Sequence, residues 1–346
     1  MAGSFKRPAN LDYDYSLAKE KKAFDKFFVD RGVPAKKANE LDVATWNIAN
    51  FGAQKRRDKE LKLIAHILGK FDIIAVQELR ANIPPLEKLM GFLGDEFDVV
   101  FTDVAGAGER LAVIYRNTRL EPGALCGELD YNPNGKVVNG KYVMPPKKQS
   151  FTHKGTKYDL DFYNFNRNPF LSSWKVRGTD YTFQLVNVHI YFGKESTKSA
   201  QFKNRMGEVF YLAEWARSQQ RASQADKVYE RRQILLGDMN IPKMDDDDPV
   251  FAALKRRGME PTAWSTQTGS TLKGFTAYDQ IVFTNKLLKV VQWSEYASTV
   301  IDYDNFIFKD LWKRKEDGDV TLSQFRGFVK WGISDHRPLF TRLVVG

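Results

Sequence analysis

The distribution of apolar residues along the chain predicts a fold in which strands and helices alternate. Short apolar runs, each of the length of a buried strand, are separated by polar turns, and longer segments show the three-to-four-residue spacing of one helix face. We expect strands at 41–46, 71–76, 111–115, 170–175, 182–188, 234–238, 277–284, 290–296 and 338–345. We expect helices at 15–30, 58–68, 85–93, 197–229 and 250–257. Neither GxGxxG nor GxxxxGKS/T occurs, which argues against a nucleotide-binding phosphate loop.

Three segments lie outside this alternation. Residues 1–40, with one phenylalanine-lined helix, are expected to be an accessory helical segment in front of a main domain at 41–346. Residues 121–158 carry turn signals and several lysines, so we expect a basic loop insertion that is either solvated or in contact with phosphate. Residues 300–331 are expected to form a charged, aromatic connection. The acidic run at 245–248 precedes Pro249 and is expected to cap a helix, not to bind calcium.

Composition narrows the class of protein. Of the 346 residues 42% are hydrophobic, ample for a sizeable core, and no stretch approaches the ~20 apolar residues of a membrane span. Cys126 is the only cysteine, so an intramolecular disulfide is impossible. The polar start at residues 1–7 lacks the apolar core of a signal peptide, so we expect a cytoplasmic protein, although removal of a signal would leave the same start. The net charge of +10 favours an anionic partner such as nucleic acid or anionic lipid.

The apolar run Ile234–Leu236 is followed by Gly237, Asp238 and Asn240. Asp238 and Asn240 are at positions i and i+2, so both point to one side of an extended backbone, where a carboxylate and an amide can hold a hard cation and its oxyanion. For this stretch taken alone, an Asp-x-Asn turn that merely closes a strand is the favoured interpretation. Binding of a cation gains support because other predicted strand ends carry the same kind of side chain.

Polar residues recur where the predicted strands begin or end. They are Asn47, Glu78, Glu109, His189, Asp238, Asn240, Asp279, Asp335 and His336. Carboxylates and amides without cysteine suit Mg²⁺, Mn²⁺ or Ca²⁺ more than a structural zinc ion. Histidines beside carboxylates can also form the pairs that orient a general acid or base. Singly, Asn47 could cap a turn, His189 could be a satisfied core histidine, and Glu78 could pair with Arg80.

Five ordered motifs carry a resemblance to a known family. Trp46-Asn47, Gln77-Glu78, Asn187-x-His189, Gly237-Asp238-x-Asn240 and Ser334-Asp335-His336 are similar to those of the endonuclease/exonuclease/phosphatase superfamily. The resemblance spans about residues 41–345. It implies an α+β fold, a four-layer αββα sandwich of two packed, mostly antiparallel sheets flanked by helices, with the catalytic domain at 41–346.

Finer stretches resemble the deoxyribonuclease I branch. They are 41–52 (LDVATWNIANFG), Gln77-Glu78-Leu79-Arg80, Asn166-Arg167-Asn168-Pro169-Phe170 and Ala277-Tyr278-Asp279-Gln280-Ile281. The resemblance implies that Glu78 is the principal metal ligand, with Asn47 and Asp335 beside it. It implies that Asp238 and Asn240 hold the scissile phosphate or a second metal ion. His189 would pair with Glu109 and His336 with Asp279; Arg167 would contact phosphate, and Arg80 would reach toward the DNA groove.

Two departures from that branch bear on the substrate. The disulfides of the secreted animal enzyme cannot form here, and Ala49 stands where that enzyme has a DNA-contacting arginine. These departures leave the chemistry intact and concern substrate preference. The resemblance implies a Mg²⁺-dependent DNA endonuclease of low sequence selectivity, acting on double-stranded DNA and leaving 5′-phosphate and 3′-hydroxyl ends. One alternative is a phosphoesterase for a phospholipid or inositol phosphate, because sphingomyelinases share the Asn-x-His and Ser-Asp-His motifs. The other is a non-catalytic nucleic-acid-binding scaffold. The motifs do not assign which histidine is acid and which is base, and they indicate no protein partner or stable membrane association.

Overall fold

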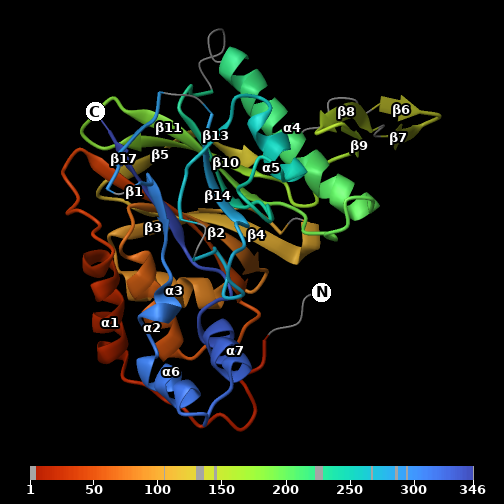
Figure 1. Cartoon of the computed structure of the whole chain (residues 1–346). Coiled ribbons are helices and arrows are strands. Elements are labelled where there is room, and N and C mark those ends of the chain that lie inside the picture. Colours follow the sequence, from red (N-terminus) through yellow and green to blue (C-terminus); the bar gives the residue numbers. More distant parts are fainter. Residues whose placement is uncertain are drawn as a thin grey trace.

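Two β-sheets packed face to face form the centre of the molecule (Figure 1). The computed structural model describes residues 5–104, 106–129, 136–143, 146–222, 229–265, 268–284, 287–293 and 295–345. The first sheet has the order β15 (Lys289–Val290), β17 (Leu339–Val344), β1 (Glu40–Phe51), β2 (Ile73–Arg80), β4 (Glu109–Arg116) and β3 (Phe97–Phe101), and β16 (Ser298–Val300) also pairs with β17. The second has the order β13 (Glu260–Pro261), β14 (Asp279–Phe283), β12 (Gln233–Asp238), β11 (Thr182–His189), β10 (Phe170–Val176) and β5 (Leu120–Glu128).

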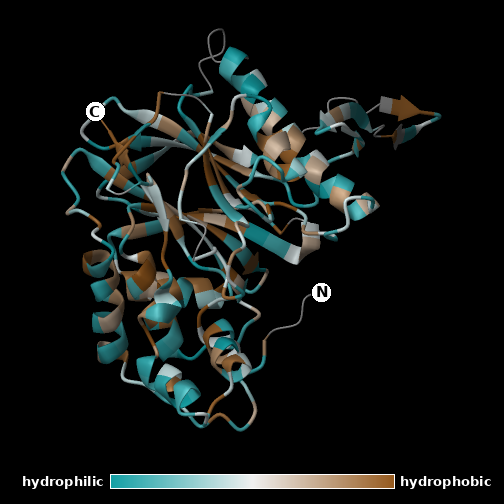
Figure 2. Ribbon diagram, viewed as in Figure 1, coloured by the Kyte–Doolittle hydropathy of each residue, from teal (hydrophilic) through white to brown (hydrophobic). Residues whose placement is uncertain are grey.

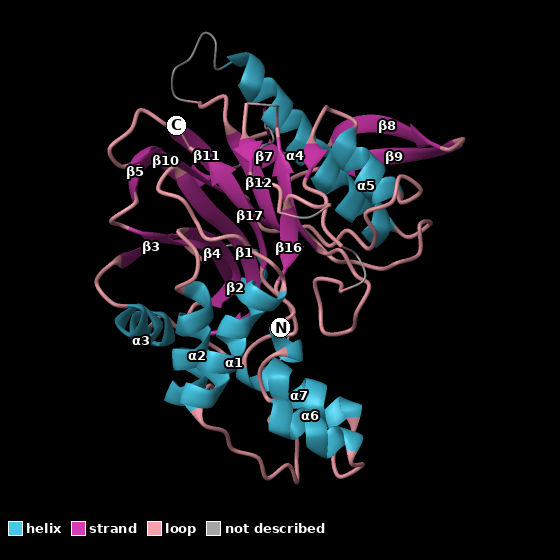
Figure 3. Cartoon of the chain, turned by 60° about the vertical axis from the view of Figure 1, so that its left-hand side comes forward, coloured by secondary structure: helices cyan, strands magenta, loops and turns pink. Residues whose placement is uncertain are grey.

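Helices cover the outer faces of both sheets (Figure 3). The first sheet carries α1 (Leu17–Asp30), α2 (Asp58–Leu68), α3 (Pro84–Leu93), α6 (Lys309–Glu316) and α7 (Leu322–Gly332). The second carries α4 (Ala200–Ala222) and α5 (Pro249–Lys255). The expected αββα sandwich is confirmed. Both sheets are mixed but mostly antiparallel, since β1 runs parallel to β2 and β11 to β12 while their other pairings are antiparallel.

The central strands are buried on both faces, which explains why they read as continuous apolar runs. In β12, Ile234 and Leu236 face the core between the sheets, whereas Leu235 packs under α4 and α5. In β2, Ile73 faces the core between the sheets and Ile74 packs under the helices of the first layer. Apolar residues accordingly concentrate in the strands (Figure 2). The sheets are thus held rigidly, which fixes the positions of side chains at their ends.

Several expected boundaries differ from the structure. β1 extends to Phe51, so Asn47 lies within the strand and not at its end. β3 was not expected; two of its residues are exposed, and a half-buried strand gives a weak apolar signal. The predicted strand at 290–296 shrinks to β15. The long helix predicted at 197–229 is α4, and residues 223–228 lie outside the described part of the chain.

The segments expected to be a loop and a connection contain regular structure. Within 121–158, the structure has most of β5, the hairpin of β6 (Lys136–Val138) and β7 (Lys141–Val143), β8 (Lys147–His153) and the start of β9 (Thr156–Phe162); residues 130–135 and 144–145 are not among those described. β8 and β9 pair with each other, and Phe151, Tyr158 and Leu160 pack into the core under α4. Residues 300–331 include α6 and most of α7. Turn residues and lysines dominated both patterns and concealed the buried positions between them.

The accessory segment packs on the first helical layer. Phe24 and Phe27 of α1 are fully buried in the core that this layer shares with the first sheet. The acidic run is confirmed as a helix cap, because the Asp248 carboxylate accepts hydrogen bonds from Val250 N and Phe251 N at the start of α5. None of the helices among the described residues has the length and apolarity needed to cross a membrane.

Candidate active site

The polar residues singled out in the sequence meet at one end of the sandwich. In the second sheet, Asp238 is the register partner of both His189 and Asp279, which places three predicted residues side by side. Asn47 of the first sheet donates from Nδ2 to Asp238 Oδ2 (3.1 Å) and to Glu78 Oε1 (3.2 Å), so the cluster spans both sheets. Polar side chains from strands that are far apart in the sequence therefore meet at this end of the sandwich.

Two histidines lie close to the same carboxylate oxygen of Asp238. His189 Nε2 lies 3.6 Å from Asp238 Oδ2, and His336 Nε2 lies 3.7 Å from that atom. The other ring nitrogen of each histidine is held by a carboxylate: His189 Nδ1 by Glu109 Oε2 and His336 Nδ1 by Asp279 Oδ2, both at 2.9 Å. A carboxylate at Nδ1 fixes the ring and leaves Nε2 to exchange a proton. The structure thus contains two oriented acid–base groups that face one point.

The carboxylates behind the two histidines differ in their own surroundings. Glu109 also faces Arg167 Nε at 2.8 Å and Arg80 Nη1 at 3.2 Å. Burial raises the pKa of Glu109, but the hydrogen bond and charge of His189, with the two guanidinium groups, outweigh burial and lower this pKa to about 2. Arg80 therefore pairs with Glu109, not with Glu78 as the simpler reading of the sequence proposed.

Around His336 the carboxylates outnumber the cations. Burial lowers the pKa of His336, but Asp279 and Asp238, joined by Asp335, raise it well above the usual value. Asp279 is fully buried and its own pKa is raised by that burial. The Asp335 carboxylate itself pairs with Lys330 Nζ at 2.7 Å. His336 therefore has a greater affinity for a proton than a solvated histidine.

Glu78 and Asn47 have the chemistry of a divalent-cation site. Asn47 is fully buried and its Oδ1 atom has no hydrogen-bond partner, an arrangement that costs free energy unless something binds there. Glu78 lies beside Asn47, with Oε2 accepting from Asn50 N at 2.8 Å and the side chain half-buried. A carboxylate and an unpaired amide oxygen suit Mg²⁺. Within the described residues, no group of three or more His, Cys, Asp or Glu side chains is arranged to hold a metal ion, so these two residues would need oxygen ligands from substrate or water.

The backbone at the site adopts conformations that cost energy. Glu78 has a φ of 63° and Asn240 a φ of 50°, both in the left-handed region that side chains seldom occupy. Gly237 lies inside β12 with a φ of 142°. A Cβ atom there would lie 2.0 Å from Val188 O, so only glycine lets β11 pass close enough to set His189 opposite Asp238.

The motifs also contain residues whose role is to join the parts of the site. Gln77 donates from Nε2 to Asn187 Oδ1 (2.7 Å), which links the two sheets directly beneath the site. Asn187 in turn donates to Val76 O and Ala112 O of the first sheet. Ser334 donates to Asn47 O (2.7 Å) and accepts from Ala49 N, so it fixes the segment containing His336 against β1. The sequence displayed these residues within the motifs, but the pattern gave no reason to assign them a structural role.

Glu208 of α4 was not singled out in the sequence. Its buried carboxylate accepts hydrogen bonds from Asn166 N and Nδ2 and from Tyr191 N, so it holds together the segment bearing Arg167 and the segment that follows His189. The sequence pattern predicts that an acidic residue in the middle of an amphipathic helix faces solvent, and only the tertiary structure reveals that Glu208 is buried.

Comparison with known proteins decides the family. Residues 44–336, most of the chain and all but the accessory segment and last strand, match the endonuclease/exonuclease/phosphatase family. The chain belongs to this family. Its solved relatives share the fold at low sequence identity: a family protein from Bacteroides vulgatus (TM-score 0.52, 14% identity, 89% of this chain and 99% of that one) and the human Nocturnin catalytic domain with bound sulfate (TM-score 0.52, 14% identity, 89% and 96%).

One curated relative has a name that states an activity, but this chain matches only part of that relative's length. A protein named deoxyribonuclease from Thioalkalivibrio sp. (strain K90mix) is 25% identical over 226 residues. The match includes 62% of this chain, and this chain spans 50% of that relative. The family contains nucleases and phosphatases, so membership identifies a phosphoester-hydrolase fold, and the substrate must be argued from the site.

Proposed function

We propose that the protein is a Mg²⁺-dependent DNA endonuclease of low sequence selectivity that hydrolyses phosphodiesters to 5′-phosphate and 3′-hydroxyl ends. The observation that carries the proposal is the pair of histidines whose Nε2 atoms face one point, each with a carboxylate at Nδ1. Hydrolysis of a phosphodiester needs a proton acceptor for water and a proton donor for the leaving oxygen, and two such groups on opposite sides of one phosphate satisfy that need. The deoxyribonuclease relative and the net charge of +10 favour nucleic acid as the substrate.

Charge neutralisation is the second requirement, because a phosphodiester anion repels its nucleophile. Glu78, Asn47 and Asp335 would hold Mg²⁺, which when bound would supply positive charge to the phosphate. Asp238 and Asn240 would position the phosphate or a second ion. Arg167 and Arg80 now pair with Glu109, and each would also offer guanidinium N–H groups to phosphates of the bound strand.

We assign His336 as the proton acceptor and His189 as the donor. Asp279 and Asp238 increase the proton affinity of His336, which suits a group that takes a proton from water at Nε2. Glu109 holds the His189 ring at Nδ1 and leaves Nε2 toward the reaction point, so His189 takes the role of donor to the leaving 3′-oxygen. Because the acceptor must be neutral, the rate is expected to rise with pH through the raised pKa of His336.

The experiment is cleavage of supercoiled plasmid with Mg²⁺, with EDTA and Glu78→Ala as controls. We expect nicking that disappears in both controls, and product ends that a ligase can seal. Far-UV circular dichroism must show that Glu78→Ala is folded. Absence of nicking by the folded wild type, together with turnover of sphingomyelin or an inositol phosphate, would move the assignment to a phospholipid or inositol phosphate phosphoesterase. DNA binding without turnover of any of these would indicate a scaffold.

A further inference from the structure

A tight loop beside the catalytic cluster is joined directly to the Ser334-Asp335-His336 segment. Thr271 forms a β-bridge with His336, and Leu272 N donates to Asp335 O at 2.9 Å. Arg337 N donates to Ser270 O at 2.8 Å. Any rigid feature of this loop is therefore held in a fixed position relative to the catalytic histidine.

The loop displays one aromatic side chain to solvent at an energetic cost. Phe275 is 77% exposed and has a φ of 44°, a left-handed conformation that is unfavourable for a bulky residue. Its loop is closed by Ser270 N donating to Thr276 O at 2.7 Å and by a 2.7 Å contact between the Thr271 and Thr276 hydroxyl groups. Strain and exposure together, in a loop bonded to the segment of His336, indicate a surface kept for a ligand.

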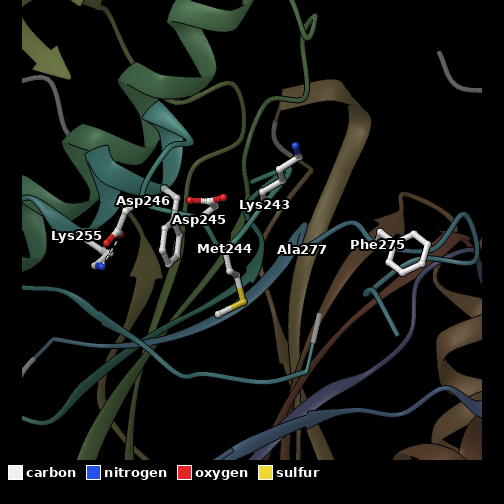
Figure 4. A pocket seen from close by; sticks show the side chains of 8 residues that line it. Lys243, Met244, Asp245, Asp246, Lys255, Phe275 and Ala277 are labelled. Carbon is white, nitrogen blue, oxygen red and sulfur yellow. Dashed lines mark hydrogen bonds and ion pairs between the residues drawn. The ribbon is translucent and has the colours of Figure 1, made fainter. Parts of the chain in front are cut away.

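Phe275 also lines one end of an open groove of about 550 Å³ (Figure 4). Ala277, two residues before Asp279 in the sequence, also lines this groove. Lys243 lines the groove, is exposed and acts electrostatically on the Asp248 carboxylate, whereas Lys255 at the other end is paired with Asp246 at 2.7 Å. Of the acidic run, Asp245 and Asp246 line the groove; Asp246 pairs with Lys255, and Asp245 accepts a hydrogen bond from Asp247 N.

We propose that Phe275 is a stacking platform for the base of a nucleoside that flanks the scissile phosphate, with Lys243 contacting the strand's next backbone phosphate. The inference rests on the proposed nuclease function and adds to it a subsite. An aromatic ring accepts any base, because every base has a π face, which agrees with low sequence selectivity. The base must leave its own stack to reach Phe275, so the subsite serves single-stranded or locally unstacked DNA.

The test is a double-mutant cycle in which a substitution in the protein is combined with removal of a base from the substrate. Short single strands carry one cleavable phosphodiester, all others being phosphorothioates, and the base on either side of that bond is present or removed. In wild type, removing the base on one side is expected to lower kcat/KM about tenfold. In Phe275→Ala, kcat/KM for the intact strand falls by a similar factor and removal of that base costs nothing further. Phe275→Trp should restore the dependence on the base.

Phe101→Ala is the matched control, because Phe101 is also an exposed phenylalanine (40%) but lies on β3 at the edge of the first sheet. It should retain the wild-type dependence on the base. A 2-aminopurine at the same position gives a second readout without turnover: binding in EDTA should quench its fluorescence with wild type and much less with Phe275→Ala.

The outcomes separate the two proposals. If wild type cleaves the strands but base removal costs the same in wild type and Phe275→Ala, the stacking platform is wrong and the nuclease stands. If wild type cleaves no strand but nicks supercoiled plasmid, the stacking platform is also wrong and the nuclease stands. If wild type cleaves neither the strands nor plasmid under conditions in which it turns over another phosphoester, the proposed function itself fails.

Discussion

The two histidine–carboxylate pairs look alike in the sequence and differ in the structure. Glu109 behind His189 is shared with two arginines, and its pKa is held at about 2. Asp279 behind His336 lies in a fully buried position and has no arginine or lysine partner among the described residues. The first pair is therefore rich in positive charge and the second in negative charge. Equal geometry with unequal electrostatics is how a site can give one histidine the donor role and the other the acceptor role.

Removing either histidine should have the largest effect. His336→Ala and His189→Ala are each expected to lower kcat for plasmid nicking by several orders of magnitude, because each removes a proton-transfer group worth about 10²–10⁴-fold and disturbs its carboxylate. The measurement is single-turnover nicking, with thermal unfolding as the check on folding. Turnover close to wild type in a folded variant would exclude that histidine from the chemistry.

Changing the carboxylates should separate the two pairs. Asp279→Asn is expected to lower kcat/KM by about 10²–10⁴-fold, because an amide cannot favour the charged ring and can reverse its tautomer. Loss of the Asp279 charge also lowers the pKa of His336, so the rising limb of the pH–rate profile should move to lower pH. Glu109→Gln should lower the rate without moving that limb. A shift of the limb in Glu109→Gln, and none in Asp279→Asn, would reverse the assignment of acceptor and donor.

Removing one arginine should have the smallest effect, on stability. In the wild type the pKa of Glu109 falls from 4.5 in the unfolded chain to about 2, so the resulting stability is present above pH 4.5 and disappears as the pH falls toward 2. Arg80→Ala raises the folded-state pKa of Glu109. It is expected to lower the unfolding free energy by about 1 kcal/mol near pH 7, with the difference shrinking below pH 4.5.

Urea unfolding of wild type and Arg80→Ala between pH 3 and 7 measures this difference. Arg110→Ala is the matched control, because Arg110 pairs with the exposed Asp103 at 3.1 Å and should change stability by little at any pH in this range. A pH-independent difference for Arg80→Ala would mean that Arg80 does not set the pKa of Glu109.

The layered fold and the members of the site could be predicted from the sequence because both leave periodic or positional signals. Strands buried on both faces, such as β2 and β12, produce apolar runs, and polar residues at their ends stand out against them. The order of the five motifs along the chain then indicated the family, which composition alone could not do. Asp238, His189 and His336 were singled out at predicted strand ends, and both histidine Nε2 atoms lie within 3.7 Å of Asp238 Oδ2.

The electrostatic difference between the pairs could not be predicted, because it depends on contacts between distant segments. Arg167 reaches Glu109 from a loop 58 residues away, and nothing in either local sequence indicates the pairing. The buried position of Glu208 within α4 was hidden for the same reason. The strands β8 and β9 were missed because their lysines and turn residues outnumber the inward-facing Phe151 and Leu160.

The central claim is that both histidines act on one phosphodiester in one step. The most direct test is the nicking rate of His189→Ala/His336→Ala compared with that of each single variant. If the two groups act together, the double variant should be about as slow as the slower single variant, because removing either one already abolishes the concerted step. Losses that multiply in the double variant would contradict the account and indicate that the histidines act independently.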